Sequence, residues 1–115
     1  MTEQETLFTK IINREIPADI IYEDDRCIAF RDINPQAPVH VLLVPKQIIT
    51  KLCYATSHEQ EILGHLMLTA PKIAEQEGYA DTFRLVINNG AEAGQSVFHL
   101  HLHILAGRPF TWPPG

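Results

Sequence analysis

Three histidines alternate with aliphatic residues near the end of the sequence, at His99, His101 and His103. Such alternation is typical of a β-strand, because successive side chains point to opposite faces of a sheet. The sequence therefore predicts a row of imidazoles on one face and a core on the other, formed by Leu100, Leu102 and Ile104. Alternate residues on a strand lie roughly 6.6 Å apart, so neighbouring rings can act on one small ligand.

The histidine row is better explained by chemistry than by packing. A single histidine usually lies on the surface or is hydrogen-bonded in the core, but three rings that titrate near neutrality repel one another when charged. Such a row costs stability unless a site uses it. Two functions are consistent with this row: a zinc site and a nucleophile that attacks phosphorus.

The composition favours one domain over residues 1–115, with 45% hydrophobic residues and both signs of charge interspersed. The net charge is −5 and the nine Lys and Arg residues are scattered, so no cationic stripe is available for a nucleic-acid backbone. We therefore expect no nucleic-acid partner. A small anionic ligand remains possible, because backbone amides and imidazoles can bind it locally.

No segment suggests export or a membrane. The first residues are acidic and polar with no apolar stretch behind them, and no run approaches the ~18 apolar residues of a membrane span. Cys27 and Cys53 form no Cys-x-x-Cys pair and have apolar neighbours, so they are expected to be reduced, partly buried thiols. These features predict a cytoplasmic protein without a membrane partner.

The first half of the chain is predicted to form one short helix and three strands. A stripe of apolar residues predicts a helix over residues 6–15, which ends before Pro17. Two β-like runs, 20–22 and 27–30, flank a charged turn and predict a hairpin. A proline-containing loop over 32–38 leads to a strand over 40–44.

The second half begins with a long predicted helix over residues 56–77. A capping box of Thr56 with Glu59, or of Ser57 with Gln60, starts it, and Gly78 ends it. Pro71 should kink this helix, because an internal proline removes one backbone hydrogen bond. Its buried stripe is predicted to contain Ile62, Leu66, Ile73 and Ala74.

The remaining pattern completes the fold class. Strands are predicted over 83–88 and 97–106, with a glycine-bounded loop between them. Helices that lie apart from hairpin-connected strands indicate an α+β domain with a mainly antiparallel sheet of about five strands. His58 and His65 fall on the long helix and are expected to be structural or solvent-facing, since neither has a partner at metal-like spacing.

The run His99-Leu-His-Leu-His-Ile-Leu matches the pattern His-φ-His-φ-His-φ-φ, in which φ is apolar. The sequence thereby resembles the histidine triad (HIT) superfamily, and in particular its histidine triad nucleotide-binding protein branch. The likeness extends over essentially the whole chain. It includes the segments Phe8-Thr-Lys-Ile-Ile, Glu15-Ile-Pro-Ala, Tyr22-Glu-Asp-Asp, Ala29-Phe-Arg-Asp-Ile, Pro35-Gln-Ala-Pro-Val-His40, Val44-Pro-Lys, Gly94-Gln-Ser96 and Trp112-Pro-Pro-Gly115.

The resemblance implies a HIT-like fold whose sheet continues across a homodimer. It also implies a purine-nucleotide site that hydrolyses the P–N bond of nucleoside 5′-phosphoramidates, including aminoacyl-adenylate-like substrates, without a cofactor or metal. His101 would attack phosphorus to give a nucleotidyl-histidine intermediate, with its other nitrogen bonded to the carbonyl of His99. His103 would donate to a phosphoryl oxygen or the leaving group, and His40 would complete the hydrogen-bond network.

The resemblance assigns further residues to the nucleotide. Those expected near the phosphate are Asn88, Gly94, Gln95, Ser96 and Val97, because a glycine admits an anion and Ser96 and the following amides can hold phosphoryl oxygens. Asp32 would accept hydrogen bonds from ribose hydroxyls. Apolar residues expected around the base or ribose are Phe8, Ile11, Ile16, Phe30 and Ile33, and Trp112 of the other protomer would contact the leaving group.

Zinc binding is one alternative to phosphorus chemistry, and a non-catalytic module that senses nucleotides or docks a partner protein is another. A His-x-His pair supplies two ligands on one face, and His40 or His103 could supply a third. Zinc-bound histidines usually donate their second nitrogen to a carboxylate, a carbonyl or water, and the nearest acid in the sequence is Glu92. The fold could bring another acid to the row. At position 48, where many family members have histidine, this chain has isoleucine, so an additional ligand there is in doubt.

Overall fold

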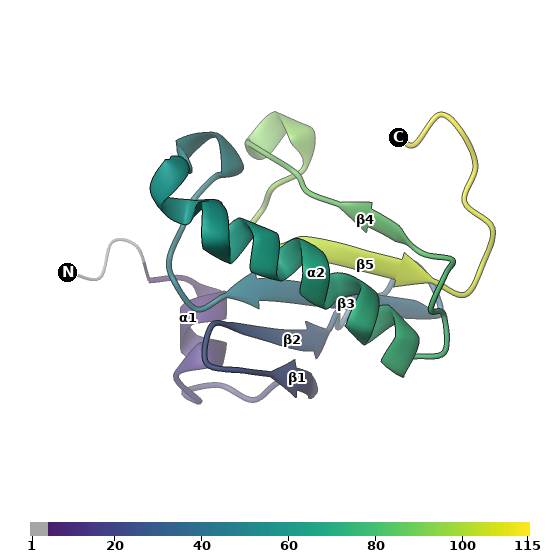
Figure 1. Cartoon of the computed structure of the whole chain (residues 1–115), viewed down its shortest axis with the longest axis horizontal. Helices are drawn as coiled ribbons and strands as arrows, with labels where there is room; N and C mark the ends of the chain where they lie inside the picture. Colours follow the sequence, from purple (N-terminus) through teal and green to yellow (C-terminus); the bar gives the residue numbers. More distant parts are fainter. Residues whose placement is uncertain (1–4) are drawn as a thin grey trace.

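The computed structural model describes residues 5–115 and contains a five-stranded antiparallel sheet in the order β1-β2-β3-β5-β4 (Figure 1). The strands are β1 (Ile20–Glu23), β2 (Cys27–Arg31), β3 (Val39–Pro45), β4 (Arg84–Val86) and β5 (Leu102–Ala106). The α-helices are α1 (Leu7–Ile12) and α2 (Gln60–Gln76), and the 3₁₀ turns are η1 (Leu52–Tyr54), η2 (Ser57–Glu59) and η3 (Ala91–Ala93). The predicted α+β class is therefore confirmed.

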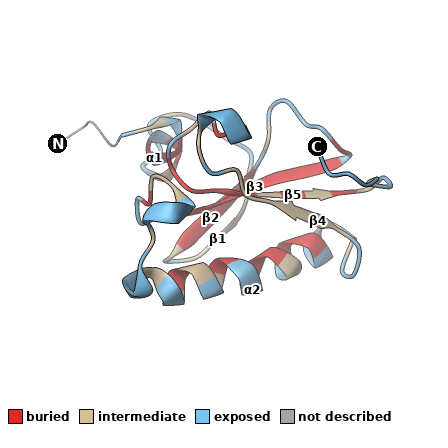
Figure 2. Ribbon diagram, turned by 90° about the horizontal axis from the view of Figure 1, so that it is seen from above, coloured by how far each residue is buried: buried red, intermediate tan, exposed pale blue. Residues whose placement is uncertain are grey.

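Helix α2 covers one face of the sheet, as the view in Figure 2 shows. Its start is the predicted capping box, in which Thr56 and Glu59 bond each other's backbone, and η2 leads into the α-helix. Its end is a Schellman motif at Gly78, whose φ is +96°. The predicted stripe packs against the aliphatic side of the histidine row; the buried residues include Ile62, Leu66, Ile73, Ala74, Leu100, Leu102 and Ile104.

Helix α1 packs on the opposite face (Figure 2) and places Phe8 and Ile11 against β2 and β3. It is shorter than predicted, because the chain leaves the helix at Asn13 rather than at Glu15. Arg14 has φ +63°, and the amide of Glu15 bonds the carbonyl of Lys10, which again forms a Schellman motif. This face of the sheet is where the imidazoles lie.

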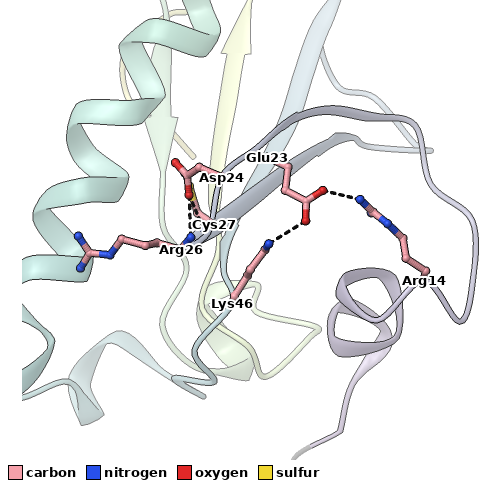
Figure 3. A network of polar contacts seen from close by, with 6 residues as sticks. All are labelled: Arg14, Glu23, Asp24, Arg26, Cys27 and Lys46. Carbon is pink, nitrogen blue, oxygen red and sulfur yellow. Dashed lines mark hydrogen bonds and ion pairs between the residues drawn. The ribbon is translucent and has the colours of Figure 1, made fainter.

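The β1–β2 turn is organised by Asp24, whose Oδ1 accepts the backbone N–H groups of Arg26 and Cys27 at 2.8 Å (Figure 3). Its Oδ2 accepts from Tyr22 and from His65 of α2, both within 2.9 Å. Burial alone would raise the pKa of Asp24, but these donors hold it well below its usual range. His65 therefore joins α2 to the turn, which agrees with its predicted structural role.

A second polar contact supports the same hairpin. Glu23 lies between the guanidinium of Arg14 and the ammonium of Lys46, so it connects the end of α1 to the end of β3 (Figure 3). The two cysteines are free, as predicted, but only Cys27 is buried. Cys53 is exposed on η1, so its predicted partial burial is wrong.

The last strand begins five residues later than predicted, at Leu102 instead of Val97. Continuing the β3–β5 register would bring Leu100 opposite Pro45, which has no N–H to donate. Leu100 instead donates to the carbonyl of Ile49 at 2.6 Å. His99 and His101 thus precede the regular strand, although the alternation of faces persists. Strand β4 is likewise shorter than the predicted 83–88.

Among residues 5–115, no helix is both long and apolar enough to cross a membrane.

Candidate active site

The central imidazole, His101, is held with one nitrogen occupied and the other free. Its Nδ1 lies 2.8 Å from the carbonyl oxygen of His99, and a carbonyl only accepts, so Nδ1 carries the proton. Nε2 has no hydrogen-bond partner among the described residues. Burial lowers the pKa of this ring, which favours the neutral form with a lone pair on Nε2. An imidazole in this state can act as a nucleophile.

His99 supports His101 from within the protein. Its ring is fully buried and its Nε2 donates to the carbonyl of Pro45 at 2.7 Å. Its Nδ1 is a buried acceptor with no partner among the described residues. The ring of His99 thus fixes the backbone whose carbonyl orients His101, and it does not face the cavity described below.

His40 on β3 and His103 on β5 form a directed pair. The backbone N–H of Gln36 donates to Nδ1 of His40 at 3.0 Å, so the proton of neutral His40 is on Nε2. That Nε2 lies 2.9 Å from Nδ1 of His103 and donates to it. The proton of neutral His103 is therefore on Nε2, which makes this atom a donor.

Both rings of this pair are held neutral. Burial lowers the pKa of His40, and burial together with the nearby His101 and His40 lowers the pKa of His103 to about 4. The carboxylate of Asp32 opposes these shifts. Its Oδ2 lies 3.4 Å from Nε2 of His40, while its Oδ1 accepts from the N–H of Asn34 at 2.8 Å.

A cavity of about 260 Å³ lies between α1, the sheet and the segment that precedes the histidine row. Most of the predicted pocket residues line it: Phe8, Ile11, Ile16, Phe30, Asp32, Ile33, Ser96, Val97, His101 and His103. The rings of Phe8 and His101 are nearly perpendicular, with centroids 4.9 Å apart. Ile33 is 97% exposed, so it stands free at the rim.

Several predicted residues lie outside the cavity lining. Gln95 is buried, and its side-chain amide is bonded entirely to backbone groups. The amide of Asn88 lies beside Gly94, where an added Cβ would be 3.4 Å from Asn88 Nδ2. Trp112 is 82% exposed, so it does not cover the core of its own protomer. His40 contacts the site through His103.

Several residues and backbone groups of the candidate site were not predicted from the sequence. The cavity is also lined by Leu7, Pro17, Ala18, Arg31 and Leu42. Pro17 and Ala18 follow the predicted Ile16, and Leu42 lies on the same face of β3 as His40. Their places in the lining could therefore have been inferred from the sequence. The roles of the Gln36 N–H and the Pro45 carbonyl could not have been inferred, because backbone groups that fix a tautomer have no sequence signature.

Among residues 5–115, two groups of side chains could hold a metal ion, each with ligand atoms within 4.8 Å of one another. One is Asp32, His40 and His103, so the fold supplies the carboxylate that the sequence neighbourhood lacks. The other is Asp24, Cys27 and His65. Existing hydrogen bonds already join His40 to His103 and His65 to Asp24. His99 and His101 belong to neither group.

Comparison with known proteins shows the family to which this chain belongs. Residues 13–110 match the family model of the HIT domain. The chain belongs to the HIT family. It is 64% identical over 112 residues to an uncharacterized HIT-like protein of Synechocystis. The alignment covers 97% of this chain and 98% of the relative.

Two further proteins are similar to this chain. The crystal structure of a HIT family hydrolase from Legionella pneumophila superposes with a TM-score of 0.92 at 45% identity, covering 95% of this chain and 98% of that one. A 14 kDa zinc-binding protein of Zea mays is 49% identical, covering 100% of this chain and 91% of the relative. The predicted family and HIT-like fold are thereby confirmed.

Proposed function

We propose that this HIT protein hydrolyses the P–N bond of purine nucleoside 5′-phosphoramidates, as members of the histidine triad nucleotide-binding branch do. The observation that carries the proposal is the state of His101. Its Nδ1–H is held by the carbonyl of His99, and the free Nε2 belongs to a ring that lines a largely apolar cavity. An imidazole in this state needs no separate base to become a nucleophile near neutral pH.

The nucleotide would extend along the cavity. The base fits between the apolar side chains from α1 and β2, among them Phe8, Ile11 and Phe30. Asp32 at the end of that wall would accept from the ribose hydroxyls, since its carboxylate borders the cavity. The α-phosphate would then lie beside Ser96 and the histidine row, where backbone amides can hold its oxygens.

The reaction would proceed in two displacements at phosphorus. Nε2 of His101 forms a bond to the α-phosphorus while the P–N bond breaks, and the amine leaves with the bonding electrons and takes up a proton. Water then attacks the nucleotidyl-histidine, loses a proton and releases the nucleoside monophosphate, which returns the lone pair to Nε2. His103 would donate its Nε2–H to a phosphoryl oxygen or to the leaving nitrogen.

The proposal includes a symmetric homodimer. Strand β4 is at the edge of the sheet and has only β5 as a partner among the described residues. Pairing of two such edges would extend the sheet and remove an exposed row of backbone groups. Trp112, which is exposed in the single chain, would then contact the leaving group in the site of the other protomer.

The decisive experiment is mass spectrometry of an acid-quenched reaction with adenosine 5′-phosphoramidate. We expect a transient AMP adduct on a peptide that contains His101. His101→Ala should remove the adduct and lower turnover on the order of 10⁴-fold, as loss of a nucleophile does elsewhere, while AMP still binds. His58→Ala, an exposed histidine on η2, is the matched control. Near wild-type turnover by His101→Ala would refute the mechanism.

A zinc-binding role is the second candidate, supported by the Asp32, His40 and His103 group and by the name of the relative from Zea mays. In our proposal no metal is needed, because His40 and His103 already hydrogen-bond each other, with Oδ2 of Asp32 3.4 Å from Nε2 of His40. Exhaustive chelation should therefore leave phosphoramidate hydrolysis unchanged. If chelation abolishes activity and one equivalent of zinc restores it, the zinc site is correct instead.

A further inference from the structure

The segment Ser96–His99 lies between the glycine-bounded loop and β5 and is not part of the regular sheet. Two contacts fix its ends to consecutive residues of the connection after β3. At one end the N–H of Leu100 donates to the carbonyl of Ile49 at 2.6 Å. At the other end the side-chain amide of Gln95 donates to the carbonyl of Thr50 at 2.7 Å.

Gln95 also closes the loop that precedes this segment. Its Oε1 accepts the N–H of Gly90 at 2.8 Å, and its own N–H donates to the carbonyl of Gly90 at 3.1 Å. Its Nε2 makes a further bond to the carbonyl of Val97 at 3.1 Å. The side chain is 4% exposed, so these bonds are shielded from water. Every polar atom of this amide is therefore used to hold backbone.

We propose that Gln95 is a positioning residue for the phosphoryl group: it acts through the backbone of Ser96 and Val97, without touching the nucleotide itself. Ser96 and Val97 both line the cavity beside His101, and Gln95 bonds Val97 directly and precedes Ser96. This inference rests on the proposed function, since it takes the ligand at this end of the cavity to be the α-phosphate of a nucleotide.

Loss of Gln95 should therefore affect the two ends of the ligand differently. Gln95 bonds the loop, Val97 and the Thr50 connection, whereas most of the apolar wall comes from α1 and β2. Loss of its bonds should displace the phosphate end and leave the nucleoside end in place. A misplacement of about 1 Å can lower a rate on the order of 10²-fold.

The test uses two substitutions of similar shape, Gln95→Met and Gln95→Glu. Gln95→Met removes all three side-chain bonds, and we expect kcat to fall by roughly 30-fold to 100-fold. The affinity for AMP should fall at least fivefold relative to wild type, while the affinity for adenosine, which has no phosphate, changes less than twofold. Gln76→Glu is the matched control, because that exposed amide also donates to a backbone carbonyl, of Ile21, on α2 far from the cavity.

Gln95→Glu adds a readout that a merely structural role would not give. As a carboxylate it would face the carbonyls of Thr50 and Val97 without a proton to donate, and burial would raise its pKa. Below about pH 6 the protonated acid should regain one donor. The kcat of Gln95→Glu relative to wild type should therefore increase as the pH falls from 8 to 5.5, which Gln95→Met and Gln76→Glu should not do.

The outcomes distinguish this inference from the proposed function. Wild-type kcat and AMP affinity in Gln95→Met would overturn it, as would equal losses of AMP and adenosine binding. If the wild-type protein hydrolyses no phosphoramidate, the proposed function fails, but the comparison of AMP with adenosine still tests the positioning role of Gln95.

Discussion

Nε2 of His40 lies 2.9 Å from Nδ1 of His103, and the direction of this bond is set from outside the pair. Because the N–H of Gln36 occupies Nδ1 of His40, protonation of His40 would force two donors together. The backbone of the loop before β3 therefore determines which nitrogen of His103 carries a hydrogen. Two successive hydrogen bonds thus connect Gln36 to the ring of His103, whose Nε2–H is the donor.

The buried histidines predict that acid destabilises the fold. Burial lowers the pKa of His103 to about 4 from the ordinary 6.5, and it also lowers the pKa of His40, His99 and His101. Between about pH 4 and pH 6.5 the unfolded chain binds more protons than the folded protein does. The free energy of unfolding therefore decreases as the pH falls through this range. The shift of His103 alone corresponds to a contribution on the order of 3 kcal/mol.

Urea denaturation at pH 7.5, 6.5, 5.5 and 4.5 measures this effect. His103→Gln retains an acceptor for His40 but does not titrate, so its stability should fall less over this range than that of wild type. His58→Gln, at an exposed position, should follow the wild-type curve. An identical pH dependence in His103→Gln and wild type would contradict the prediction.

Gly107, directly after β5, should tolerate no side chain. Its φ is +97°, and an added Cβ would lie 2.8 Å from Cβ of Pro38, a ring that cannot rotate away. We expect Gly107→Ala to destabilise the protein by about 2–4 kcal/mol, from strain and overpacking together. The measurement is the urea midpoint at pH 7.5.

Gly64 within α2 is the control for this substitution. No atom lies within 4 Å of an added Cβ there, and alanine is the better helix former, so Gly64→Ala should stabilise by about 0.5–1 kcal/mol. Equal effects of the two substitutions would show that the contact with Pro38 is not the cause.

Periodic patterns predicted the layers of this fold because they depend on short-range chemistry. The stripe of α2 and its caps at Thr56 and Gly78 were correct, since capping and amphipathicity involve residues close in sequence. The start of β5 was wrong because Pro45, far away in sequence, ends the ladder by lacking an N–H. Alternation alone cannot reveal the partner strand.

The candidate site was likewise predicted only in part from the sequence. The types and spacing of His99, His101 and His103 were sufficient to predict that the imidazoles share one face of the sheet, and the reactivity of the row stays a prediction. The roles of Asp32 and Gln95 depend on which backbone groups their side chains meet, and position in a motif does not determine this. Gln95 was expected to bind the nucleotide, yet its amide is bonded to protein backbone.

The cavity predicts weak discrimination between adenine and guanine. Its walls beside the proposed base site are apolar, and the guanidinium of Arg31, a lining residue, is paired with Glu77 at the end of α2 and with Asp19. Stacking and shape distinguish two purines poorly, so the kcat/KM values for AMP and GMP phosphoramidates should differ by less than ~100-fold. A larger ratio would reveal a polar contact to the base edge.

The C-terminal segment predicts how the protomers share the proposed site. Arg84 of the edge strand donates to the carbonyl of Thr111 and lies over Phe110, so the segment begins against β4. Trp112 is left exposed beyond this anchor. In the proposed homodimer it reaches the leaving-group end of the other site, while the nucleoside end is built within one protomer.

Removing the residues after Arg108, or the substitution Trp112→Ala, should therefore change the ratio of rates for bulky and small amine leaving groups. AMP affinity should stay within about twofold of wild type, because the nucleotide contacts come from α1, β2 and the segment before β5. Thr111→Ala, whose backbone carbonyl still accepts from Arg84, is the control for Trp112→Ala. Analytical ultracentrifugation should give a dimer at micromolar concentration; a monomer there, or a truncation that slows all substrates equally, would refute the shared site.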